Sequence, residues 1–257
     1  HPAFSHAGGF YQEELELEIT SPIENAKIYY TLDGSEPDPI HNEQNTFEYT
    51  GPIPLKDRTP EENVWSMIPT NNNVESRFWN PPTTNVPKAT VIRAAKFIDD
   101  WKSETVTHTY FVQQEYTLPV IALTTDGSNF FHEEKGIYVA GVNHNPNAVK
   151  PDETGNYYER GDEWERPIHI EFFEKDGKRA FAQNAGVRIH GAFTRRMPQK
   201  TLRLYSRSDY GTSRFSYQFF EDKPIDDFNR LLLRNSGNDW GSTMFRDAAA
   251  QRIIRHM

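Results

Sequence analysis

The chain has 257 residues, with 28 lysines and arginines against 37 aspartates and glutamates, and no cysteine. A net charge of −9 with interspersed acidic and basic residues argues against nucleic-acid binding, which needs a concentrated basic surface. Without cysteine there is no disulfide or zinc–thiolate site, and no apolar run reaches the ~20 residues of a membrane-spanning helix. At about 150 residues per domain, the length favours two domains.

The first part of the chain is predicted to be all β. Strand patterns occur at residues 14–19, 26–32, 90–97 and 105–112. Between them, residues 38–87 are polar and rich in Pro and Asn, which predicts a long inserted loop. We therefore predict an accessory domain over residues 1–115 that carries the insertion 38–87.

The second part, residues 116–257, is predicted to be rich in hairpins. Apolar strand patterns occur at residues 119–123, 168–174, 186–190, 200–206 and 231–233. A short helical turn is expected after Ser128. The one amphipathic helix is expected at the end of the chain, with Ser242 as a cap and Phe245 and Ile253 on its apolar stripe.

Several motifs in the first part resemble a known module. They are NAKIYYTLDGSEP at residues 25–37, ATVIRA at 89–94 and THTY at 107–110. Together they resemble the immunoglobulin-like or fibronectin-III-like β-sandwich at the C-terminal end of chitobiases and β-hexosaminidases, which also occurs as an accessory domain of exported proteins. That module is not the catalytic domain, so the resemblance implies no hydrolase activity.

Two features of this part admit more than one reading. Oxygen donors around Asp33-Gly34-Ser35 suggest calcium, but the alternating donor pattern of a calcium loop is absent, so we predict a structural turn. In the insertion, Trp65, Phe78 and Trp79 either stack on a sugar ring or pin the loop to the sandwich, and we prefer pinning.

The second part carries a denser set of motifs. They are LPVI at residues 118–121, ERPIHIEFF at 165–173, AGVRIHG at 185–191, PQKTLRLY at 198–205, LRNSGNDW at 233–240 and MFRDA at 244–248. Together they resemble the N-terminal part of the spore-coat-protein-H (CotH) kinase family, atypical protein kinases that use ATP and a divalent metal to phosphorylate secreted or coat proteins. The resemblance implies an exported or cell-surface protein with a β-rich portion of a kinase-like α+β fold, mainly β with few helices.

Candidate nucleotide-binding residues lie among these motifs. Strand parity places Lys200 on the apolar face, so its ammonium either reaches past the strand end or points into a cleft, and the resemblance favours the cleft. The turn at residues 191–194 offers backbone amides to phosphate, with Arg195 nearby. Asp239 is expected to help cap the last helix, from which Arg246 either faces solvent or pairs with a carboxylate or phosphate in a cleft.

In the resembling family, the catalytic and metal-binding aspartates follow the last helix of this chain. The sequence therefore predicts no catalytic base and no metal ligand here, and we expect this part to be inactive alone. Exposed Phe245 and Ile253 would then favour a dimer through that helix. The rival hypothesis is a non-catalytic surface module whose β-sandwich binds glycan or a partner protein through the loop from Trp65 to Trp79.

Overall fold

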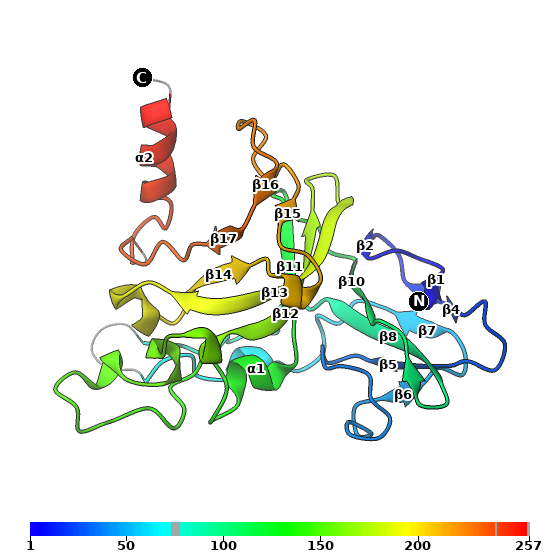
Figure 1. Ribbon diagram of the computed structural model, residues 1–257. Coiled ribbons are helices and arrows are strands. Elements are labelled where there is room, and N and C mark those ends of the chain that lie inside the picture. The colour runs from blue at the N-terminus through cyan, green and yellow to red at the C-terminus, as the bar shows by residue number, and fades with distance from the viewer. Residues whose placement is uncertain (73–77, 240, 256–257) are drawn as a thin grey trace. The chain divides into compact units, whose positions relative to one another are not determined.

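The computed structural model describes residues 1–72, 78–239 and 241–255 (Figure 1). Within these residues the chain is mainly β-strand, with two α-helices, α1 (Gly127–Phe131) and α2 (Arg246–Arg255). The predicted mainly β fold with few helices is therefore confirmed. No helix in the described ranges has the length and apolar character needed to cross a membrane.

The chain forms two compact units, each assembled from separate segments. The first unit comprises residues 1–64, 82–127 and 168–183, and the second comprises residues 65–81, 128–167 and 184–257. The boundary expected between residues 115 and 116 stays a prediction.

The first unit is built from short, mostly antiparallel sheets. Its strands are β1 (Ala3–Phe4), β2 (Gly9–Tyr11), β3 (Leu15–Leu17), β4 (Ile19–Thr20), β5 (Lys27–Thr31), β6 (Phe47–Glu48), β7 (Ile53–Leu55), β8 (Thr90–Ile98), β9 (Trp101–Lys102), β10 (Val106–Val112) and β11 (Val120–Thr124). The largest sheet has the order β2-β10-β8-β5-β6, with β9 paired to β8 and β2 parallel to β10. Smaller pairs are β1 with β4 and β3 with β7.

Alternating side chains build the core of this unit. Leu17 and Ile19 are buried while the glutamates between and beside them are exposed, as a half-buried strand requires. The inserted loop is more ordered than predicted, because β7 pairs with β3 and places Ile53 and Leu55 in the same core. Prolines on both sides of Ile53 hid this strand from the sequence pattern.

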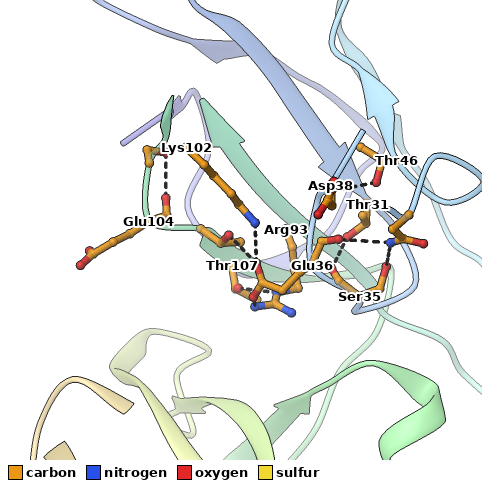
Figure 2. A network of polar contacts seen from close by, with 12 residues as sticks. Thr31, Ser35, Glu36, Asp38, Thr46, Arg93, Lys102, Glu104 and Thr107 are labelled. Carbon is orange, nitrogen blue, oxygen red and sulfur yellow. Dashed lines mark hydrogen bonds and ion pairs between the residues drawn. The ribbon is translucent and has the colours of Figure 1, made fainter. Parts of the chain in front are cut away.

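The DGSEP motif forms a tight turn held by a polar network (Figure 2). Asp33 accepts hydrogen bonds from the amide and hydroxyl of Ser35 at 3.0 and 2.6 Å, and Gly34 has a φ of +85°. Glu36 accepts from Lys102 at 3.2 Å and forms an ion pair with Arg93. These contacts confirm the structural turn, because the carboxylates are occupied by protein donors.

The second unit carries the end of a longer sheet. Its strands include β12 (Arg166–Phe173) and β13 (Arg179–His190), which both cross the boundary between the units, followed by β14 (Thr201–Tyr205), β15 (Phe215–Ser216), β16 (Asp227–Phe228) and β17 (Arg230–Leu233). The sheet has the order β11-β12-β13-β14-β17, and β15 pairs separately with β16. The chain also has 3-10 turns at Trp65–Met67, Pro151–Glu153, Asn156–Tyr158, Asp162–Trp164, Phe193–Arg196 and Ser208–Tyr210.

The two faces of β13, β14 and β17 differ in polarity. Val187, Ile189 and Leu204 are buried on one face. The antiparallel register places Arg188 opposite Arg203 and Tyr205 opposite Arg230 on the other face. This alternation makes one face the core and leaves the other polar.

A buried asparagine organises the loops before β12. The Asn156 amide donates to the carbonyls of Glu133 and Gly136 at 2.8 and 3.1 Å, and its oxygen accepts from the Asn143 side chain at 2.8 Å. Because the side chain is only 1% exposed, its hydrogen bonds hold segments that lack regular secondary structure.

Candidate functional site

The second unit contains a pocket of about 720 Å³, which we call the loop–helix pocket. Three segments line it: the turn at residues 191–194 after β13, the loop at 234–239 after β17, and the first turn of α2. His190 of β13, Thr201 of β14 and Leu232 of β17 complete the wall. The volume lies within the range of about 300–1,000 Å³ typical of small-molecule sites.

Asn235 anchors the loop after β17 to the start of β14. Its side-chain oxygen accepts hydrogen bonds from Thr201 Oγ1 at 2.8 Å and from the Gly237 amide at 3.1 Å. Its amide nitrogen donates to the Gln199 carbonyl at 2.5 Å. Asn235 is 3% exposed, so this network fixes the loop from beneath the pocket.

Two glycines let the pocket loops meet at Thr194. A Cβ on Gly191, which has a φ of +112°, would lie 2.4 Å from Thr194 Oγ1. A Cβ on Gly237 would lie 2.3 Å from Thr194 Cγ2. Both positions therefore require glycine for the loops to approach this closely.

Asp239 joins the pocket wall to the start of α2. Its carboxylate accepts hydrogen bonds from the Thr243 hydroxyl and from the Arg246 amide, the latter at 3.0 Å. The hydrogen bond from the Thr243 hydroxyl is the main cause that lowers the pKa of Asp239, followed by the one from the Arg246 amide. Asp239 thus caps α2 as expected, whereas Ser242 contributes its backbone amide, which donates to the Asp239 carbonyl at 3.0 Å.

Two arginine–carboxylate ion pairs lie at the pocket. Arg246 lies 3.3 Å from Asp239, and Arg234 pairs with Asp247. Both arginines are more than half exposed, at 70% and 55%, so their guanidinium groups can turn toward a ligand. Burial, followed by the nearby arginines, lowers the pKa of His190.

Arg195, predicted to bind the nucleotide, has a structural environment. Its guanidinium donates to the carbonyls of Ile189, Gly191, Tyr157 and Glu159 at 2.7–3.0 Å. Burial is the main cause that lowers the pKa of Arg195 to about 10. The side chain therefore fastens the turn after β13, and nucleotide binding by Arg195 stays a prediction.

Lys200 is also buried, at 3% exposure. Its ammonium donates to the Met197 carbonyl at 2.8 Å and lies 4.1 Å from the centre of the Tyr157 ring and 5.4 Å from that of Tyr138. Burial lowers the pKa of Lys200 well below its usual value. Lys200 thus lies just before β14 with its ammonium buried, whereas its place on the apolar face and its binding of a cofactor stay predictions.

The structure thus brings one of the three predicted nucleotide-binding residues to the pocket. Among the described residues that line it, Arg246 is present and Lys200 and Arg195 are not. His190 and Thr201 were not predicted as pocket residues, although their strand parity places them on one face. Their proximity to the loop after β17 depends on a strand pairing that the sequence pattern does not specify.

Trp65, Phe78 and Trp79 of the insertion all lie among the described residues. Trp65 stacks on Phe131 of α1, with ring centres 5.4 Å apart and planes at 23°. The Trp79 amide donates to the Asn71 side chain at 3.3 Å. Trp65 is therefore pinned, but to α1 and not to the sandwich, while residues 73–77 of this loop and Trp240 lie outside the described residues.

Within residues 1–72, 78–239 and 241–255, no group of three or more His, Asp or Glu side chains is placed to hold a metal ion.

Comparison with known families confirms the order of the two resemblances. Residues 17–110 match the family model described as "Fn3 associated", and residues 187–257 match the one described as "CotH kinase protein". The second match begins within β13 and includes all the described residues that line the loop–helix pocket. No curated protein matches the chain.

Proposed function

We propose that the second unit binds ATP in the loop–helix pocket, as part of an exported protein kinase similar to the CotH family. One observation carries the proposal: all three segments that line the pocket fall within residues 187–257, the stretch that matches the CotH kinase protein model. In this proposal the pocket supplies the binding site for the phosphoryl donor.

The pocket has the donor groups that a polyphosphate requires. The Gly191 turn presents backbone in a conformation open to close approach, and Arg246 and Arg234 supply guanidinium groups at the rim. Their present partners, Asp239 and Asp247, balance these charges. ATP would therefore displace at least one ion pair, and Arg246 would move from Asp239 to a phosphate oxygen.

Lys200 and Arg195 have supporting roles in this proposal. Arg195 and Lys200 both hold carbonyls of the chain between Ile189 and Met197, so they position the turn that faces the phosphates. The divalent metal implied by the resemblance has no ligand set among the described side chains. The metal would then be bound through ATP itself and through none of the side chains in residues 1–72, 78–239 and 241–255.

The test is isothermal titration of the whole chain with ATP, with and without magnesium. Replacement of Arg246 by alanine should weaken ATP binding about ten- to a hundredfold, because loss of a hydrogen bond to a charged group costs about 1.5–3 kcal/mol. Arg252→Ala is the matched control, since Arg252 is exposed on the same helix and does not line the pocket. It should leave the affinity unchanged.

Two outcomes would contradict the proposal. One is wild-type chain that does not bind ATP, and the other is equal binding by the wild type and the Arg246→Ala variant.

Lys200→Ala is expected to abolish binding indirectly, and its thermal midpoint should fall as well. Loss of ATP binding at an unchanged midpoint would instead assign Lys200 a direct contact with the nucleotide.

The remaining parts of the proposal follow the resemblance. The protein would act at the cell surface or outside the cell, with a secreted or coat protein as acceptor, and phosphoryl transfer would need aspartates beyond those described here. Glycan recognition by the sandwich is the rival function. Glycan-array binding that is lost on Trp79→Ala, without ATP binding, would favour it.

A further inference from the structure

The polar face of β13, β14 and β17 carries a concentration of arginine. We call it the arginine face, and it consists of Arg188, Arg203, Arg207, Arg230 and Arg234. The whole chain has a net charge of −9, so such a surface runs against the general charge of the protein.

The arginine face has fewer carboxylate partners than guanidinium groups. Arg188 and Arg207 share Glu165 and Asp162, and Arg234 pairs with Asp247. Within residues 1–72, 78–239 and 241–255, neither Arg203 nor Arg230 forms an ion pair with a carboxylate. Five arginines therefore share three carboxylates, which leaves the surface positive.

Ring contacts hold this excess charge in place. The guanidinium groups of Arg188, Arg207 and Arg230 lie 4.6, 5.0 and 5.4 Å from the centre of the Tyr205 ring. Arg203 lies 3.0 Å from His190 Nε2. Arginine–ring contacts of this kind stabilise like charges close together. The donors of Arg188 and Arg207 bind Glu165 and Asp162, whereas Arg230 makes no ion pair within the described residues and keeps its donors for a ligand.

The layout of the arginine face suits an extended chain. Arg230 and Leu232 of β17 and Arg234 just after it occupy alternate positions, and Leu232 is 46% exposed between the two arginines. β17 is the last strand in its sheet. At about 3.3 Å per residue, these positions span about 13 Å. That length exceeds what one phosphate group covers and matches alternate side chains of an extended peptide.

We propose that the arginine face binds an extended acidic segment of polypeptide, with Asp or Glu at alternate positions and an apolar residue over Leu232. The inference rests on the proposed function, because His190, Leu232 and Arg234 also line the loop–helix pocket. A segment bound here would lie beside the phosphoryl donor. The acidic segment would thus select the acceptor protein.

The test measures fluorescence anisotropy of a labelled peptide in which glutamate alternates with valine and threonine, added to the whole chain without nucleotide. Binding should weaken as salt increases. The double variant Arg203→Gln with Arg230→Gln should weaken it about tenfold or more, and a peptide with glutamine for glutamate should not bind. Lys223→Gln is the control, since Lys223 is an exposed cation outside the arginine face.

Thermal unfolding of each variant separates binding from folding, and the two arginines that are changed make no ion pair within the described chain. Equal peptide affinity in the double variant and the wild type would overturn the proposal, as would tighter binding of polygalacturonate than of the peptide. ATP is titrated separately. If ATP binds and the peptide does not, only the arginine face is refuted; if the peptide binds and ATP does not, the kinase role is refuted.

Discussion

At the scale of single residues, the first unit buries a neutral histidine beside two charged groups. His108 Nδ1 accepts hydrogen bonds from the Gly8 amide at 3.2 Å and from Arg179, which also pairs with Glu171 at 2.8 Å. Burial, followed by Arg179 and His169, lowers the pKa of His108 to about 3. A proton on Nδ1 would break both hydrogen bonds, so the imidazole stays neutral in the folded protein.

This histidine should make stability depend on pH. The pKa of His108 is about 3 in the folded protein and about 6.5 in the unfolded protein. Neutral His108 therefore contributes fully to the free energy of unfolding above pH 6.5. This contribution is lost as the pH falls toward 3, by at most about 1.4 kcal/mol per pH unit. His108→Asn keeps an acceptor oxygen, so its urea midpoint should change less between pH 7 and 5. The raised pKa of Glu171 acts with the opposite sign and is common to both proteins.

Arg195 gives a second residue-scale prediction. Arg195→Met would leave four carbonyls, two of them in buried hydrogen bonds, without their donor and should lower the free energy of unfolding by about 3 kcal/mol. Arg195→Lys should cost less, because an ammonium still serves some of these carbonyls. Urea denaturation measures both, and equal stability of the wild type and the methionine variant would refute the fastening role.

At the scale of elements, α2 depends on its cap. The helix has 10 residues, most of them exposed, and isolated helices shorter than about 12–15 residues are marginal in water. Asp239→Ala removes the acceptor of the Arg246 amide and should reduce hydrogen-exchange protection in α2. Ser242→Ala should leave this protection unchanged. A larger loss of protection in Ser242→Ala than in Asp239→Ala would show that Ser242 caps the helix.

The strands show what periodicity can and cannot predict. The patterns at residues 90–97 and 105–112 became β8 and β10 almost to the residue, because long runs rich in β-branched and aromatic residues predict strands directly. β6 and β7 were missed because two or three residues between turns carry no period. For the candidate site, parity placed Lys200 on the apolar face, but the burial of its ammonium under tyrosines from distant loops has no local signal.

At the scale of the whole molecule, each compact unit draws on distant parts of the chain. Phe173, which is fully buried, packs edge-on against Phe10 and Phe111 at 5.7 and 5.5 Å. All three belong to the first unit, although the predicted accessory domain ends at residue 115. The stability of that domain therefore includes an aromatic contact from a strand that sequence alone assigns elsewhere.

A fragment of residues 1–115 should accordingly unfold at a lower temperature than one of residues 1–183, because it lacks Phe173 and exposes Phe10 and Phe111. Loss of a buried phenylalanine side chain typically costs about 3–5 kcal/mol. Circular dichroism during heating measures both midpoints. Equal midpoints would establish the boundary at residue 115 as the end of an independent domain.

The buried amine of Lys200 has a practical consequence. Amine-reactive reagents attack the unprotonated form, which is favoured at Lys200 because burial lowers its pKa, yet the surrounding tyrosines shield it from solvent. Acylation at this position, read by mass spectrometry, would then occur only during openings of the second unit. The rate of acylation at Lys200 would thus report how often the second unit opens, without an introduced label.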